Sequence, residues 1–140
     1  MKPYEIFDYA NDGYQKLFHH QSWRIAILNY IDELEIEHID YVEAHLETDE
    51  VFVLLAGTCT LIFAHEKQSK IQSFECVALK KHKVYKVPKG TYHACVLSQD
   101  AKVLIVEEEN TCYDNSPRIY LTDTDKEKMK LCFNSAYENI

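Results

Sequence analysis

The chain has 140 residues, the size of one domain, and 46% of them are hydrophobic, enough to form a core. It carries 15 Lys and Arg against 23 Asp and Glu, a formal net charge of -8, which argues against nonspecific nucleic-acid binding. No apolar run approaches the roughly 18 residues of a membrane span, and the first ten residues lack the apolar core of a signal peptide. We therefore expect one domain over residues 1–140, in the cytoplasm, with five reduced cysteines.

From Tyr14 onward the sequence predicts mainly short β-strands. The expected strands are 23–30, 39–47, 51–56, 59–64, 71–79, 82–87, 91–97 and 102–107. Gly57 separates two continuously apolar runs, which indicates a hairpin buried on both faces, and Pro88-Lys89-Gly90 is a turn signal. Many short strands separated by turns are typical of a β-sandwich or barrel, whose core we place at about residues 14–109.

The C-terminal segment has a different, helical periodicity. Its apolar residues recur at helical spacing and are Met129, Cys132, Phe133, Ala136 and Tyr137. Thr124 with Glu127 forms a possible capping box, and Thr122 with Asp125 is the alternative. We predict an amphipathic helix over about residues 125–138, lying on the outside of the β domain.

Acidic and imidazole side chains occur in two segments at a spacing that suits a metal site. The segments are Glu43-x-His45-x4-Glu50-x6-Gly57 and Pro88-x-Gly90-x2-His93. Residues 43 and 45 of a strand face the same side, Glu50 opens the next strand, and His93 follows a turn in a distant segment. Carboxylates and imidazoles that converge from three strands are a donor set for a divalent metal.

These segments resemble the paired motifs of the cupin superfamily, G(x)5HxH(x)3–4E(x)6G and G(x)5PxG(x)2H(x)3N. The matching residues are His45, Glu50, Gly57, Pro88, Gly90 and His93. The resemblance covers about residues 39–107; it departs at the leading glycines, at Glu43, where the family has its first ligating His, and at Leu97, which replaces the trailing Asn. It implies a small single-domain bacterial cupin: an all-β, double-stranded β-helix (jelly-roll barrel), often dimeric, with a metal inside.

By this resemblance His45, Glu50 and His93 are the expected metal ligands, and Fe, Mn, Ni and Zn all suit them. Asp49 is the alternative to Glu50, because adjacent strand residues face opposite ways and only one of the two points inward. Glu43 is interpreted as a further ligand or as a general base beside an open site, and otherwise as a carboxylate on a solvated face.

Arg24, Tyr41 and Phe52 are the candidates for a substrate pocket. Arg24 interrupts an apolar strand, and it either holds a carboxylate or phosphate of a ligand or forms a structural salt bridge. Tyr41 and Phe52 either line a pocket or belong to the core. The acidic run Glu107–Glu109 is interpreted as a charged strand end on the surface.

The resemblance implies a metal-dependent enzyme that acts on a small polar metabolite, such as an oxygenase, an isomerase or a lyase. The alternatives are a non-catalytic binding or sensing cupin and a metal-free sugar isomerase or epimerase. No nucleic acid or membrane partner is expected. We expect a homodimer, because 51–64 is apolar on both faces and a barrel interior covers only one; the C-terminal helix or the N-terminal segment is the alternative cover.

Overall fold

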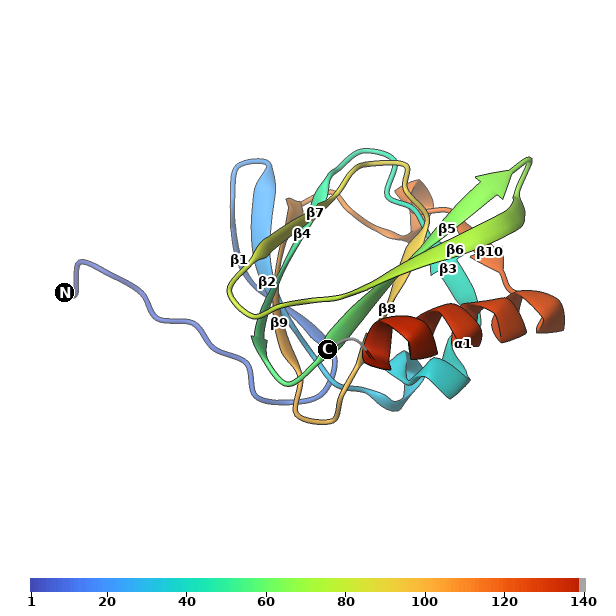
Figure 1. Cartoon of the computed structure of the whole chain (residues 1–140). Coiled ribbons are helices and arrows are strands. Elements are labelled where there is room, and N and C mark those ends of the chain that lie inside the picture. The colour runs from blue at the N-terminus through green and yellow to red at the C-terminus, as the bar shows by residue number, and fades with distance from the viewer. Residues whose placement is uncertain (139–140) are drawn as a thin grey trace.

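A computed structural model describes residues 1–138, and its strands form two five-stranded antiparallel sheets that face each other (Figure 1). The first sheet contains, in spatial order, β1 (Tyr14–His20), β2 (Trp23–Asn29), β9 (Lys102–Glu108), β4 (Glu50–Ala56) and β7 (Val84–Val87). The second contains β10 (Arg118–Tyr120), β3 (Tyr41–Glu43), β8 (His93–Leu97), β5 (Cys59–Lys67) and β6 (Lys70–Ala78). Short 3₁₀ turns lie at Asp32–Leu34, Ile36–His38 and Tyr113–Asn115. This arrangement confirms the predicted jelly-roll barrel.

The interior of the barrel is filled by alternate residues of the strands of both sheets. On β4, Phe52 and Leu54 are each 2% exposed, whereas Val51 and Val53 face outward and are half-buried. The inward side chains pack against residues of the opposite sheet such as Leu61. Burial of each large apolar side chain contributes roughly 1.5–3 kcal/mol, so this interior cluster holds the two sheets together.

Helix α1 (Asp123–Glu138) packs on the outer face of the second sheet, across β5 and β6 (Figure 1). Its Met129 is fully buried against Ile62 of β5. The cap is Thr122, since the Asp125 amide donates to Thr122 Oγ1 at 3.1 Å and the Thr122 amide donates to Asp125 Oδ2 at 3.0 Å. The helix predicted outside the barrel is therefore present, and it begins two residues before the expected start at 125. This helix is not long and apolar enough to span a membrane, and no other described helix is.

The expected strand over 39–47 is much shorter in the structure. β3 ends at Glu43, and His45 lies beyond it. The neighbouring strand β10 begins only after Pro117, which has no amide hydrogen and interrupts the ladder. The backbone remains attached there by irregular bonds, such as that from Ala44 N to Pro117 O at 3.0 Å. β10 itself was not predicted, because three residues are too few to show a period.

Gly57 lies in the β4–β5 turn at a φ of +67°, a left-handed conformation that side chains rarely adopt. The hairpin predicted here was wrong, because β4 and β5 belong to different sheets and the turn connects the two sheets. A Cβ at this position would lie 2.7 Å from the backbone of Ala101. Gly90, in the turn before β8, has a φ of +81° but nothing within 4 Å of such a Cβ. Both positions therefore need a residue that tolerates a positive φ. Only at Gly57 would a side chain also collide with neighbouring backbone.

We therefore predict that Gly90→Ala lowers the free energy of unfolding by about 1–2 kcal/mol, the cost of a left-handed non-glycine residue. Gly57→Ala should cost a further 1–3 kcal/mol or so, because the backbone of Ala101 must move. Urea unfolding of both variants measures the difference. Equal losses for the two variants would contradict the packing argument.

Candidate functional site

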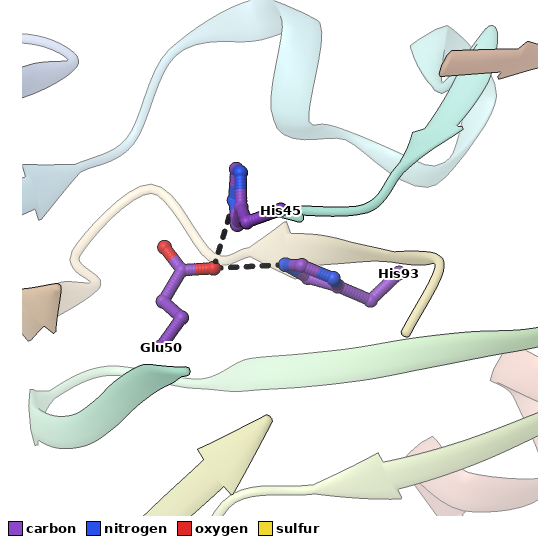
Figure 2. Close-up of side chains that lie close together, drawn as sticks. All are labelled: His45, Glu50 and His93. Carbon is purple, nitrogen blue, oxygen red and sulfur yellow. Dashed lines mark hydrogen bonds and ion pairs between the residues drawn. The ribbon is translucent and has the colours of Figure 1, made fainter. Parts of the chain in front are cut away.

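Three donor side chains meet inside the barrel: His45 just after β3, Glu50 at the start of β4 and His93 at the start of β8 (Figure 2). Glu50 Oε1 lies 2.9 Å from His93 Nε2 and 3.2 Å from His45 Nε2. One donor atom from each residue can be chosen so that all three lie within 4.8 Å of one another. The structure thus brings together the three residues that the two sequence segments indicated. It also places Glu50 inward and leaves Asp49 exposed.

The two sequence segments are also joined through their backbones. The amide of Gly90 donates to the carbonyl of His45 at 2.7 Å, and the amide of Lys89 donates to the Asp49 carboxylate at 2.9 Å. The turn that carries Gly90 is therefore fixed to the loop between β3 and β4. This attachment explains how His93, far along the chain, reaches His45 although His45 lies outside any strand.

The hydrogen bonds of His93 define which of its nitrogens carries a proton. Its Nδ1 lies 2.9 Å from the carbonyl oxygen of Thr91, which can only accept, so Nδ1 must donate. In the neutral imidazole the lone pair is then on Nε2, which faces the carboxylate of Glu50 at 2.9 Å. Two acceptors at that distance repel each other unless a proton or a metal cation lies between them. The site is therefore built around a positive charge.

His45 is held by a serine that the sequence analysis did not single out. Its Nδ1 lies 2.7 Å from the Oγ of Ser116, which is 3% exposed. Ser116 in turn donates to Asn115 Oδ1 at 3.3 Å. With the hydroxyl proton directed to Asn115, Ser116 accepts from His45 Nδ1 and leaves the Nε2 lone pair for the site. No local sequence signal marks Ser116, because its role depends on a contact 71 positions away.

The short distances between the imidazoles and the carboxylate shift the pKa values of Glu50 and His45. Burial alone would raise the pKa of Glu50, but hydrogen bonds from His45 and His93 outweigh it and lower that pKa. Burial alone would lower the pKa of His45, and its hydrogen bond to Glu50 with attraction from Glu50 and Glu43 raises it instead. The pair therefore favours a charged carboxylate beside a positively charged partner.

Glu43 lies at the edge of the cluster rather than among its donors. Its Oε1 is 4.0 Å from His45 Nε2, and its Oε2 accepts from Arg118 Nε at 3.0 Å. The sheet register places Glu43 directly between Arg118 of β10 and His93 of β8, so all three side chains share one face. The hydrogen bond to Glu43 raises the pKa of Arg118.

A second carboxylate, Glu107, also faces the interior, and the interpretation of Glu107–Glu109 as a surface strand end was wrong at this position. Glu107 is 5% exposed. Its Oε2 accepts from Tyr14 Oη at 2.6 Å and from Arg24 Nη2 at 2.8 Å. Burial and the nearby charge of Glu50 raise the pKa of Glu107. The inward alternation of Val103, Ile105 and Glu107 along β9 is the sequence signal that could have identified it.

All these groups line one cavity of about 570 Å³, a volume typical of a small-molecule site. The expected pocket residues Arg24, Tyr41 and Phe52 are all in its lining. Arg24 lies in the cavity wall, and its salt bridge to Glu107 is the structural alternative made from the sequence. Leu28 and Ile105 supply apolar wall between the polar groups.

The sequence matches no family model, and no curated protein matches it. Solved structures do resemble the fold. A cupin-2 domain protein from Shewanella frigidimarina aligns over 72% of this chain and 85% of its own, with 19% identity and a TM-score of 0.52. A Streptomyces PAC13 variant, solved with uridine, aligns over 89% and 98%, with 10% identity and a TM-score of 0.57. The Fe(II) form of HppE aligns over 67% of this chain and 48% of its own, with 13% identity and a TM-score of 0.53. At such low identities the structural likeness shows the fold alone, and it is the cupin fold.

Removal of Arg24 should destabilise the fold, because the buried Glu107 carboxylate then has no cation beside it. We predict that Arg24→Met lowers the free energy of unfolding at pH 7 by about 3 kcal/mol, because it leaves a buried charge without its cation. The double variant Arg24→Met/Glu107→Gln should recover much of this loss. Urea unfolding measures both.

The sign of the pH dependence follows from the raised pKa of Glu107. Ionisation of Glu107 opposes folding, so the deficit of Arg24→Met is largest at neutral pH. It should shrink as the pH falls through the raised pKa and the carboxyl group takes up a proton. A deficit that stays constant with pH, or grows on acidification, would show that Arg24 stabilises the fold in another way.

Proposed function

We propose that this chain is a metal-dependent cupin that binds a divalent transition metal through His45, Glu50 and His93 and acts on a small polar metabolite in the cavity. The observation that supports it most directly is the hydrogen bond from His93 Nδ1 to the Thr91 carbonyl. It directs the Nε2 lone pair at the Glu50 carboxylate, an arrangement that a cation between the two atoms would stabilise. When bound, the metal would act as a Lewis acid toward an oxygen of the metabolite.

The donor set fits such an ion, and so do the two spacings between Glu50 and the imidazoles. Neighbouring donors of a six-coordinate ion with bonds of about 2.1 Å lie about 3 Å apart, and the two imidazole–carboxylate distances are 2.9 and 3.2 Å. Three protein donors leave positions open for a ligand. Two imidazoles with one carboxylate are typical of non-haem Fe(II) proteins, and one structural neighbour was solved in its Fe(II) form. Fe(II) is therefore the first ion to test, with Mn, Ni and Zn as alternatives.

Glu43 is proposed as the general base beside the metal rather than as a fourth ligand. Its Oε1 is 4.0 Å from His45 Nε2, which puts it next to the open side of the cluster. Arg118 holds its other oxygen and so fixes the direction of the carboxylate. A carboxylate oriented toward the ligand cavity suits proton transfer to or from a bound molecule.

Two other functions use the same geometry. In a metal-free isomerase or epimerase, a proton would occupy the space between His93 and Glu50, and a His base would work with a Tyr acid. Tyr14 of the cavity donates its hydroxyl hydrogen to Glu107 and to neither imidazole. It therefore forms no His–Tyr acid–base pair, which favours the metal-dependent function. In a non-catalytic binding or sensing module, the metal would hold a metabolite without turnover.

The metal proposal predicts about one transition-metal ion per chain after purification without a His tag or added metal, measured by elemental analysis. His93→Ala should weaken Fe(II) or Mn(II) binding by more than about 100-fold, because it removes a ligand at a cavity and leaves the packed core intact. Glu43→Gln is the matched control, and it should change the metal affinity by less than about tenfold. Equal metal binding by the parent and the His45→Ala/His93→Ala variant would contradict the proposal.

The same measurement has a predicted pH dependence. Metal binding requires neutral imidazoles, and the net effect of the cluster is to raise the pKa of His45 despite its burial. Protons should therefore compete with the metal at a pH above the usual imidazole value of about 6.5. Affinity should fall steadily as the pH is lowered from 8 to 6.

We also propose that the chain forms a homodimer through the outer face of the first sheet. Its outward, half-buried apolar residues are Ile25, Val51, Val53, Leu104 and Val106. Helix α1 covers β5 and β6 of the second sheet and so leaves the outer face of the first sheet without a helix (Figure 1). The N-terminal segment covers part of the first sheet: Phe7 stacks on Phe18 of β1 with ring centroids 4.9 Å apart, and the Tyr9 carbonyl accepts from Asn29 and Lys102. The five residues above remain half-buried, and the start of the chain extends away from the barrel. A second copy is the proposed cover.

Light scattering at micromolar concentration should therefore give twice the chain mass of 16.4 kDa. Val53→Glu places a charge at the proposed interface and should shift the mass to that of one chain. Lys70→Gln, which alters an exposed strand end on the second sheet, is the control and should leave the dimer intact. A parent protein that remains monomeric would refute this interface.

A further inference from the structure

The two arginines of the cavity differ in how many of their donors the protein uses. Arg24 is fully occupied: Nε and Nη2 donate to Glu107, Nη2 also donates to the Thr111 carbonyl, and Nη1 donates to the Glu109 carbonyl. Its side chain is 14% exposed. Arg24 therefore neutralises Glu107 and ties the segment after β9 to the barrel, and no edge of its guanidinium is left to recognise a ligand.

The protein uses fewer of the guanidinium donors of Arg118. Among residues 1–138, the one carboxylate that pairs with it is Glu43, at Nε, and its side chain also hydrogen-bonds to Tyr120, so its terminal nitrogens have no acidic partner. Its guanidinium lies over the ring of Tyr41 at 4.1 Å and near that of Tyr113 at 5.0 Å. Rings on its faces hold the plane of the guanidinium and leave its edge for hydrogen bonds. All three residues line the cavity, and the Arg118 side chain is 28% exposed.

We infer that Arg118 is the anchor for an anionic group of the ligand, a carboxylate or a phosphate, whose other end carries a hydroxyl or carbonyl oxygen directed to His45, Glu50 and His93. This inference rests on the proposed function for its second half. A guanidinium edge binds carboxylate and phosphate through paired hydrogen bonds. Glu43 lies between Arg118 and the donor cluster, with Oε2 3.0 Å from Arg118 Nε and Oε1 4.0 Å from His45 Nε2. A ligand of only a few atoms in length therefore spans them.

The charges of the groups around the three donors are compatible with an anion once a divalent ion is bound. Glu43 is balanced by Arg118 and Glu107 by Arg24. Glu50 is then the one deeply placed carboxylate of this group left to the metal, and a divalent ion exceeds its charge by one. The loaded site thus attracts a single negative charge, and Arg118 determines where along the cavity that charge lies.

The test uses the protein loaded with Mn(II) and isothermal titration with three probes. They are 4-hydroxybutanoate, glycerol 3-phosphate and butane-1,4-diol, which lacks an anionic group. At least one anion should bind the parent at least tenfold more tightly than the diol, and the tighter anion identifies carboxylate or phosphate as the preferred group. Arg118→Gln should abolish this preference and leave Mn(II) affinity within a fewfold range. Arg118→Lys, which keeps the charge and loses the planar edge, should retain only part of it.

A double variant separates recognition from charge balance. Arg118→Gln also leaves Glu43 unpaired, so Arg118→Gln/Glu43→Gln restores neutrality without restoring the guanidinium. Anion preference should stay lost in the double variant and stay intact in Lys70→Gln, which removes one exposed positive charge outside the cavity. Recovery in the double variant, or no preference for either anion in the parent, would overturn the inference. Failure of the parent to bind Mn(II) would instead contradict the proposed function, and the same titrations on metal-free protein would then decide whether Arg118 selects anions.

Discussion

A buried carboxylate between two imidazoles is the constraint on which the rest of this site depends. Glu50 is 6% exposed, and a charge in such a place is costly unless a partner of opposite charge accompanies it. The Thr91 carbonyl directs the lone pair of His93 at Glu50, and Ser116 can do the same for His45. Three donor atoms thus lie close together, and a proton or a metal cation between them makes the arrangement favourable. The jelly-roll barrel supplies the positions, because β3, β4 and β8 come from both of its sheets.

Two other acids of the cavity, Glu107 and Glu43, each pair with an arginine on the neighbouring strand. Glu107 of β9 is in register with Arg24 of β2, and Glu43 of β3 is in register with Arg118 of β10. Neighbouring strand residues that face one side are close enough for such pairs. The pairs differ in burial, since Arg24 is enclosed and Arg118 lies nearer the opening. One pair therefore serves the fold, and the other is available to a ligand.

The sequence could predict the parts of this site that depend on local spacing. The position of Glu50 at a strand start and of His93 after a Pro/Gly turn follows from the two-residue period and the turn signal, and the structure brings both to one point. Glu107 was missed although the alternation along β9 placed it inward, because a run of three glutamates resembles a surface. Arg118 was missed for a stronger reason: it pairs with Glu43 at a separation of 75 residues. No local pattern carries that register, and its strand is three residues long.

We propose above that a metal ion occupies the point between His45, Glu50 and His93. The most direct measurement is anomalous X-ray diffraction from crystals grown anaerobically with Fe(II), recorded on both sides of the iron absorption edge. We predict one iron peak per chain, within bonding distance of His45 Nε2, His93 Nε2 and a Glu50 carboxylate oxygen. A cavity without an iron peak, in which Glu50 keeps its hydrogen bonds to both imidazoles, would contradict it.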